Sequence, residues 1–260
     1  MRVNEHSALS TAQILLVPYS EHHVPAYHEW IQDKELQEAT ASEPLSLEEE
    51  YAMQKSWRTD HDKLTFIICL PLPAPGISPN FEGGLSVLRA ANAKVDDSPD
   101  RMVGDINLFL FPPDSEEMEE DVLNVGGNVV GEIEVMIARK DLKRQGHGRA
   151  ALLTFLEYIL ANWSSIAAEY AQFQQQKQQD GAETQTPDTI TTSTPKLSFL
   201  RVKINQTNIG SIKLFESVGF VRTVEDANYF GEIELRWLPD VTILRRQKGW
   251  EKASELAYQE

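Results

Sequence analysis

The distribution of hydrophobic residues divides the chain into segments with strand-like and helix-like spacing. A continuous apolar run at 64–70 (LTFIICL) is typical of a buried strand, and residues 102–111 (MVGDINLFLF) have the same character. Apolar and polar residues alternate at 132–138, which predicts a strand with one face in the core. Residues 151–160 then carry apolar side chains at helical spacing. The centre of the chain therefore predicts strands followed by a long buried helix.

The flanking regions add further elements of both kinds. Ser46 and Glu49 have the spacing of a capping box, so a helix is expected to begin there. The other expected elements are a strand at 14–19, a helix beginning near Pro25, a strand at 196–204, a helix at 208–219 that ends at Gly219, and a strand at 230–238. The strand, helix and strand between 132 and 204 should form a right-handed parallel crossover, with the remaining strands antiparallel.

Three segments of different composition predict insertions into one domain that spans residues 11–240. Residues 71–100 are rich in Pro, Gly, Ala, Ser and Asp, and residues 112–128 are acidic and end in glycine. Residues 171–195 are polar and of low complexity. We expect all three to be flexible surface segments, and the charged tail at 241–260 to be helical or frayed.

The overall charge and the apolar content restrict the partners and the compartment. A formal charge of −16 would repel nucleic-acid backbones, so we expect no nucleic-acid partner and favour a basic one. The single cysteine, Cys69, excludes a disulfide framework and is interpreted as a small buried residue of an apolar strand. No run approaches the roughly 18 apolar residues of a membrane span, and no leader pattern opens the sequence. We therefore expect a cytoplasmic protein without a membrane partner, with the nucleus as the alternative compartment.

A basic island around two glycines contrasts with this acidic background. Residues 139–149 hold five of the chain's 24 basic residues, and they surround Gly146 and Gly148 between the predicted strand and helix. Free N–H groups at a helix N-terminus attract anions, and glycine lets a phosphate approach the backbone closely. The glycine spacing matches neither the G-x-x-x-x-G-K-[ST] nucleotide loop nor the G-x-G-x-x-G dinucleotide loop. The loop predicts a phosphate site of another kind.

The loop and the element after it carry a resemblance to a known superfamily. KRQGHGRAALL (143–153) resembles the Q/R-x-x-G-x-G/A coenzyme A pyrophosphate loop of the GNAT acetyltransferases, and NIGSIKLFESVGF (208–220) resembles the element that follows it. Residues 16–57, GDINLFL (104–110) and GEIEVMIA (131–138) resemble the N-acetyltransferase 9-like branch. The resemblance implies a mixed α+β fold of the α/β class, with about seven mostly antiparallel strands and about four flanking helices. It also implies acetyl transfer from acetyl-CoA to a lysine or α-amine of a protein or peptide, without a metal.

The resemblance further assigns residues to coenzyme A. Backbone groups at the end of the strand would bind the pantetheine arm, one N–H would serve the carbonyl oxygen, and the loop would bind the pyrophosphate. The residues so assigned are Met136, Ile137 and Ala138 in the strand, Lys143, Arg144, Gln145, Gly146, His147, Gly148 and Arg149 in the loop, and Asn208 beyond it. Lys143 stands where the pattern has Gln or Arg, so it keeps a cation but loses the forked geometry. Ser211 would either cap the following helix or meet the ligand.

The residues assigned to catalysis are Glu132, Glu134 and Asn208. The two glutamates lie on the face of the strand opposite its apolar residues, where either one would accept a proton from the amine or remain a solvated surface residue. Deprotonating a lysine at neutral pH costs roughly 4 kcal/mol, and an α-amine well under about 1 kcal/mol. Phe215 stands where many members of the superfamily have a tyrosine acid, so the leaving thiolate would need Tyr229, a water or direct release.

Two other functions and one other site are compatible with the sequence. A regulatory protein that binds coenzyme A without turnover is the main alternative, because Phe215 cannot donate a proton. A protein that uses the same loop for ATP is the other. The clustered histidines His22, His23 and His28 lack metal-ligand spacing with carboxylates, so we interpret them as part of a surface helix and not as a zinc site.

Overall fold

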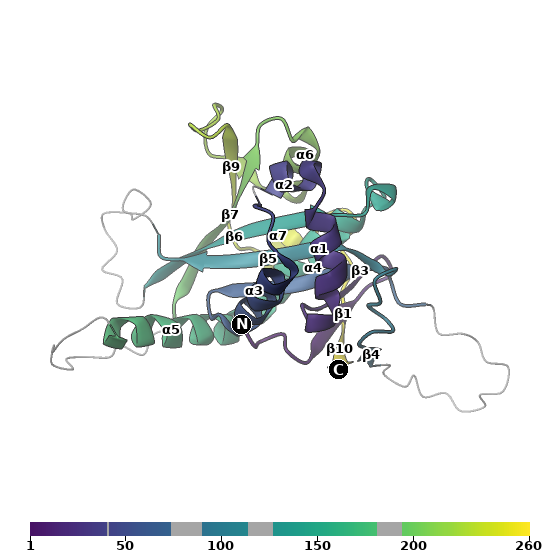
Figure 1. Cartoon of the computed structure of the whole chain (residues 1–260). Coiled ribbons are helices and arrows are strands. Elements are labelled where there is room, and N and C mark those ends of the chain that lie inside the picture. Colours follow the sequence, from purple (N-terminus) through teal and green to yellow (C-terminus); the bar gives the residue numbers. More distant parts are fainter. Residues whose placement is uncertain (41, 74–89, 114–126, 181–193) are drawn as a thin grey trace, which may run out of the picture.

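One mixed sheet forms the centre of the molecule in this computed structural model, which describes residues 1–40, 42–73, 90–113, 127–180 and 194–260. Its ten strands follow the order β4-β10-β1-β2-β3-β5-β6-β7-β9-β8 (Figure 1). The strands are β1 (Ser7–Ser10), β2 (Leu15–Pro18), β3 (Lys63–Cys69), β4 (Ala91–Asn92), β5 (Met102–Phe111), β6 (Asn128–Ile137), β7 (Lys196–Asn205), β8 (Val221–Arg222), β9 (Glu232–Trp237) and β10 (Ser254–Gln259). The expected mixed, mostly antiparallel fold is confirmed, with more strands than the seven or so predicted.

The predicted parallel crossover lies at the middle of the sheet. β6 leads through α4 (His147–Ala161) and α5 (Trp163–Asp180) to β7, which pairs with β6 in parallel. Within the described ranges, no single helix is long and apolar enough to cross a membrane, and α4 with α5 as far as Gln172 would reach that length only as a pair bent by 71°. Nine of the fifteen residues of α4 are buried, so the helix belongs to the core.

The helices cover both faces of the sheet, because successive strand residues point to opposite sides. On one side, α1 (Val24–Ile31), α2 (Lys34–Thr40) and α3 (Leu47–Thr59) pack on a core that includes Leu15 and Ile67. On the other side, α4, α6 (Ile209–Val218) and α7 (Val241–Leu244) pack on a core that includes Leu16 and Phe66. Figure 1 shows α1 and α3 in front of the strands and α4 behind them. Burial raises the pKa of Cys69 well above its usual value, as the interpretation of a small buried residue requires.

The local signals in the sequence are reproduced at the ends of two helices. The Ser46 hydroxyl accepts a hydrogen bond from the backbone N–H of Glu49, and the Glu49 carboxylate accepts one from the N–H of Ser46 at 2.8 Å. The predicted capping box is therefore confirmed at the start of α3. At the end of α6, Gly219 adopts a φ of +104°, a conformation that favours glycine.

Parts of the predicted insertions and of the predicted tail are ordered. Residues 90–100, which we expected in a flexible segment, contain β4 and the buried carboxyl groups of Asp96 and Asp97. The tail is neither helical nor frayed at 254–259, because β10 pairs with β1 and β4 there. Residues 171–180 continue α5. The remaining parts of the three segments, at 74–89, 114–126 and 181–193, lie outside the described residues.

Candidate active site

The two parallel strands at the centre of the sheet separate part-way along their length. β6 pairs with β7 only from Asn128 to Glu132, whereas its pairing with β5 continues to Ile137. β7 runs on to Asn205 with β9 as its partner. Among the described strands, none pairs with residues 133–137 of β6 on the side of β7. The backbone groups on that open side are available to a ligand.

Alternation along β6 decides which backbone groups face the open side. The N–H of Ala138 donates to the carbonyl of Val103 at 2.9 Å, so it is directed toward β5. The carbonyl of Met136 is also directed there, because a Cβ at Gly104 of β5 would lie only 1.8 Å from it. Val135 and Ile137 therefore face the open side. Of the three strand residues assigned to pantetheine, only Ile137 has its backbone groups on that side, and Val135 joins it.

The loop after β6 places a helix N-terminus beside this open side. Gly146 adopts a φ of +94° as the N-cap of α4, and the first N–H groups of a helix have no partner within it. A Cβ at Gly148 would lie 3.4 Å from Leu214 and 3.5 Å from Ile137. The start of α4 is thus in contact with the end of β6 and with α6. The free N–H groups at the start of α4 and the unpaired edge of β6 therefore lie at the same end of the sheet.

Two cations of the basic island remain free beside these donors. Lys143 and Arg144 are exposed, and within the described part of the chain neither side chain has a hydrogen bond or an ion pair. The other side chains of the island are held by the protein: Arg139 by Asp141, Lys140 by Asp33 and Glu35, Gln145 by the carbonyl of Asp141, His147 by that of Gln13, and Arg149 by those of Lys248 and Ser217. Of the seven predicted loop residues, Lys143 and Arg144 thus have side chains that are open to a ligand, and Gly146 and Gly148 lie at the N-terminus of α4. The side chains of Gln145, His147 and Arg149 hold the loop in place.

Asn208 lies at the start of α6 and has a structural task there. Its Oδ1 accepts a hydrogen bond from the backbone N–H of Ser211 at 3.1 Å, so Asn208 is the N-cap of the helix. Ser211 is therefore the capped residue and not the cap. The amide nitrogen of Asn208 is the part of the side chain that is left for a ligand.

The face of the sheet under α1 carries a group of carboxyl and amide side chains. Glu134 on β6 lies directly across from Asn107 on β5, and Asp105 lies across from Met136. The Asn107 amide donates to Asp105 Oδ2 at 2.8 Å, and the Tyr27 hydroxyl of α1 donates to the same oxygen at 3.4 Å. Burial raises the pKa of Asp105 to about 6. Asp105 and Asn107 were not among the predicted site residues, although two polar residues in the apolar run MVGDINLFLF were a visible signal.

Glu134 is the most exposed of the carboxyl groups on this face that the structure describes. Its side chain is exposed, yet protein encloses it on most sides. The resulting loss of hydration raises the pKa of Glu134 to about 7, and the negative charges of Asp105 and Glu132 add to the increase. A carboxylate with a pKa near neutrality is suited to accept and release a proton at physiological pH.

Glu132 is engaged by cations of the neighbouring strand. Arg201 Nε donates to its carboxylate at 2.8 Å, and Lys203 Nζ lies 3.9 Å away. These cations occupy the carboxylate oxygen that an acceptor amine would need to reach. Of the two glutamates assigned to catalysis, Glu134 has the environment of a general base.

The two aromatic residues considered for proton donation lie in contrasting environments. Phe215 is 1% exposed and packs edge-to-face on Phe220, so it belongs to the core. A hydroxyl at that position would have been buried among apolar rings, and the phenylalanine says nothing against turnover. Tyr229 is 97% exposed between β8 and β9, beside Phe230.

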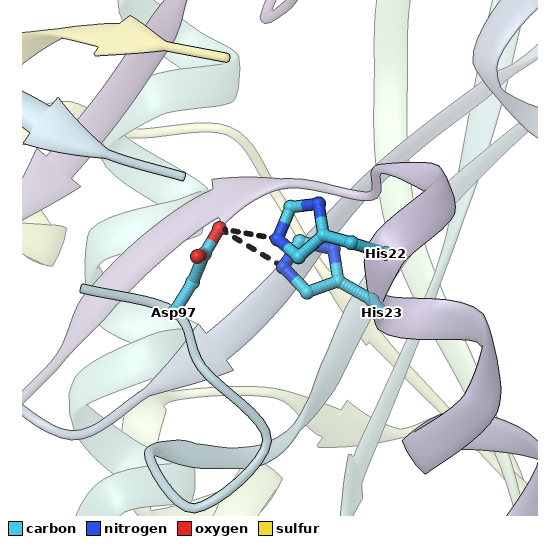
Figure 2. A group of neighbouring side chains, drawn as sticks. All are labelled: His22, His23 and Asp97. Atoms are coloured by element: carbon cyan, nitrogen blue, oxygen red, sulfur yellow. Dashed lines mark hydrogen bonds and ion pairs between the residues drawn. The ribbon is translucent and has the colours of Figure 1, made fainter. Parts of the chain in front are cut away.

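The one group among the described residues with a metal-like ligand set is His22, His23 and Asp97 (Figure 2). Asp97 Oδ2 lies 3.1 Å from Nε2 of His22 and 3.0 Å from Nε2 of His23. The backbone N–H of Ser20 donates to Nδ1 of His23 at 3.0 Å, so the ring proton is on Nε2 and faces the carboxylate. Because a metal ligand needs an unprotonated nitrogen, these residues form a hydrogen-bonded cluster. The surface-helix interpretation is wrong for His23, which is fully buried.

Comparisons with known proteins agree with this geometry. The family model of the acetyltransferase (GNAT) domain matches residues 13–221. An N-acetyltransferase 9-like protein of Schizosaccharomyces pombe is 33% identical over 247 residues, which cover 90% of this chain and 97% of that protein. The alpha/beta-tubulin-N-acetyltransferase 9 of Homo sapiens is 33% identical over 251 residues, which cover 96% and 90%.

Solved structures share the fold at low sequence identity. Spermidine N-acetyltransferase from Vibrio cholerae, in complex with CoA and spermine, is similar with a TM-score of 0.51 at 12% identity, over 88% of this chain and 97% of that one. The family match, the relatives and the fold agree with one another. This chain belongs to the GNAT family, in its N-acetyltransferase 9-like branch, and is an acetyl-CoA-dependent N-acetyltransferase.

Proposed function

We propose that this enzyme acetylates the N-terminal α-amine of a protein, with tubulin as the acceptor. The pKa of Glu134 supports the choice of amine: a base near 7 is about one unit below an α-amine near 7.8, but more than three units below a lysine near 10.4. At about 1.4 kcal/mol per unit, proton transfer from lysine costs roughly 3.5 kcal/mol more. The name of the human relative, alpha/beta-tubulin-N-acetyltransferase 9, supports tubulin.

The residues at the open side of β6 fit acetyl-CoA, which supplies an acetyl group activated as a thioester. Lys143 and Arg144, with the free N–H groups at the start of α4, match the charge of a pyrophosphate. Val135 and Ile137 offer the backbone groups for the pantetheine arm, and an N–H of this edge would donate to the carbonyl oxygen. The amide nitrogen of Asn208 is a further donor on the same side.

Glu134 carries the proton in this proposal. An α-ammonium group must lose a proton before its nitrogen can attack a carbonyl carbon, and the ionised Glu134 carboxylate accepts it. Because solvent reaches Glu134, the carboxyl group can release that proton before the next turnover. The charge of −16 favours an acceptor segment that carries cations of its own.

Paired peptides test the choice of amine. One peptide carries the tubulin N-terminal sequence with a free α-amine, and its partner has the α-amine blocked and a single lysine. At pH 7.5 we expect kcat/KM to be at least about a hundredfold higher for the free α-amine, because the proton transfer is easier. Faster acetylation of the lysine peptide would overturn the proposal. An unrelated peptide with a free α-amine tests tubulin separately, since equal turnover would remove tubulin as the preferred acceptor.

Replacing Gly148 by glutamate is expected to weaken coenzyme A binding by at least about tenfold. The side chain would project beside the start of α4, between Leu214 and Ile137, and would bring a negative charge to a site for phosphates. Isothermal titration with coenzyme A measures the effect. The control is Gln172→Glu on the exposed side of α5, which adds the same charge elsewhere. Equal affinity of Gly148→Glu and the unmodified protein would contradict the assignment of the loop.

A further inference from the structure

Two buried polar side chains on β5 have no direct contact with the acceptor or the cofactor in the activity described so far. Asp105 is 2% exposed and Asn107 is 3% exposed, and both point to the face of the sheet under α1. A buried polar group costs about 1–3 kcal/mol when its hydrogen-bonding partners are missing. A strand that is otherwise apolar would be more stable without them, so their presence needs a specific reason.

The hydrogen bond between these residues fixes the direction of the amide. An ionised carboxylate only accepts hydrogen bonds, so the NH₂ group of Asn107 must be the end that faces Asp105 Oδ2, at 2.8 Å. Its carbonyl oxygen, Oδ1, is consequently directed away from Asp105. This oxygen is buried and has no hydrogen-bond partner among the described residues.

The unpartnered oxygen lies on the residue that faces Glu134. Asn107 and Glu134 are directly opposed in the ladder between β5 and β6, where Cβ atoms are about 4.5–5.5 Å apart. Asn107 Oδ1 can only accept a hydrogen bond. An ionised Glu134 has no proton to donate to it, but a protonated Glu134 has one.

We propose that Asn107 and Asp105 are positioning residues for Glu134, in which Asp105 orients the Asn107 amide so that its carbonyl oxygen accepts a hydrogen bond from Glu134 after proton transfer. The inference rests on the proposed role of Glu134 as the base. In the step itself, an N–H bond of the α-ammonium group breaks, its electron pair stays on nitrogen, and an O–H bond forms on Glu134. The new O–H then donates to Asn107, which stabilises the protonated carboxyl and makes Glu134 a stronger base. Solvent removes the proton afterwards.

Other charged and titratable groups surround Glu134 and contribute to its proton affinity. They are Asp105 on β5, Glu132 on β6 with its partners Arg201 and Lys203 on β7, and Tyr27 on α1. Beyond Tyr27, the pair of His28 on α1 and Glu50 on α3 lies on the same face. Of these groups, Asp105 responds directly to a change at Asn107, because the Asn107 amide donates to its carboxylate and lowers its pKa. A change at Asn107 therefore acts on Glu134 through the lost hydrogen bond and through Asp105, the two positioning residues of the proposal.

The test is a titration of the Glu134 carboxyl group in the intact protein. Carbon-13 NMR of protein labelled at the glutamate carboxyl carbon gives its pKa, and the resonance is assigned by its loss in Glu134→Gln. In Asn107→Leu we expect this pKa to fall by about one unit, and the acid limb of kcat/KM against pH to move down by the same amount. Turnover at pH 8 should fall about tenfold, because a weaker base takes the proton less readily. Asn107→Ser, which is small and polar, should give the same shift if the leucine variant folds poorly.

The control for this test is a substitution at Thr65. Thr65 lies across from Asn107 on β3, so Thr65→Val makes an isosteric change on the other side of the same residue, and it should leave the pKa of Glu134 unchanged. An unchanged pKa in a folded Asn107 variant, with normal coenzyme A affinity, would overturn the inference. If the pKa falls while Glu134→Gln keeps full turnover, the hydrogen bond is supported and the proposed role of Glu134 as the base fails.

Discussion

Replacing Glu134 by glutamine is expected to lower kcat/KM by about a hundred- to a thousandfold and to leave the affinity for coenzyme A unchanged. The amide has the shape of the carboxylate but cannot accept the proton of the acceptor amine. A positioned general base contributes roughly 10²–10⁴-fold to a rate. We place the loss in the lower part of this range, because an α-amine near its pKa is partly neutral without help. Steady-state kinetics with the tubulin peptide, together with calorimetry of coenzyme A binding, measures both quantities.

The pH dependence of kcat/KM gives a second measure of the role of Glu134. Burial raises the pKa of Glu134 to about 7, so the carboxylate form that acts as a base is present above that pH and is lost as the pH falls through it. The acid limb of kcat/KM should therefore show an apparent pKa near 7 in the unmodified enzyme, and in Glu134→Gln this limb should move up to the pKa of the acceptor α-amine, near 7.8. Glu132→Gln is the matched control, since Glu132 is ion-paired with Arg201, and we expect it to lower kcat/KM less than tenfold. Equal losses in the two variants would remove the distinction between them.

Replacing Asp97 by alanine is expected to lower the free energy of unfolding by about 3–5 kcal/mol, because several buried donors lose their acceptor at about 1–3 kcal/mol each. A single buried carboxylate binds His22 and His23 at the start of α1, the hydroxyl of Tyr258 on β10 at 2.6 Å, and the N–H of Lys94. Its loss leaves buried donors without an acceptor and disconnects three parts of the chain. Urea unfolding monitored by circular dichroism measures the change.

Asp100→Ala is the control for this second expectation. Asp100 is exposed in the same segment, so its replacement should cost less than about 1 kcal/mol. A similar cost for the two aspartates would show that Asp97 does not hold these segments together.

Lowering the pH should weaken the Asp97 cluster, and so reduce the free energy of unfolding, in the unmodified protein. Hydrogen bonds from His22, His23 and Tyr258 hold the pKa of Asp97 well below its usual range, against the opposing effect of burial, so its stabilising contribution is complete above the unfolded value near 3.8 and declines below it. Burial lowers the pKa of His23, so the folded state binds fewer protons there than the unfolded state. That difference also reduces stability as the pH falls below about 6.5. Both contributions have the same sign.

The features that could be predicted from the sequence are those that depend on neighbouring residues. The spacing of Ser46 and Glu49 contains the whole capping box, and the strand, glycine loop and helix around Gly146 are contiguous. The order of elements was then sufficient to predict the parallel pairing of β6 and β7. These predictions need no knowledge of distant contacts.

The features that were missed depend on contacts between distant segments. Asp97 is buried because histidines 74 and 75 residues earlier and Tyr258, 161 residues later, meet at its carboxylate. No local pattern contains that information. The direction of backbone groups was also beyond the sequence, since the choice between Met136 and Val135 depends on the register with β5.

The pairing of β10 with β1 also bears on how this protein is made. Ala257 lies across from Ser7, and Tyr258 lies across from Ala91, so the edge of the sheet that supports the start of α1 is completed by residues near 258. A nascent chain on the ribosome can form the crossover at β6 and β7 before those residues exist, but it cannot complete the Asp97 cluster. Contacts of such large sequence separation form slowly. The sheet edge that supports α1 should therefore be assembled last, and a chain cut short before residue 254 should contain the glycine loop at 143–149 without that edge.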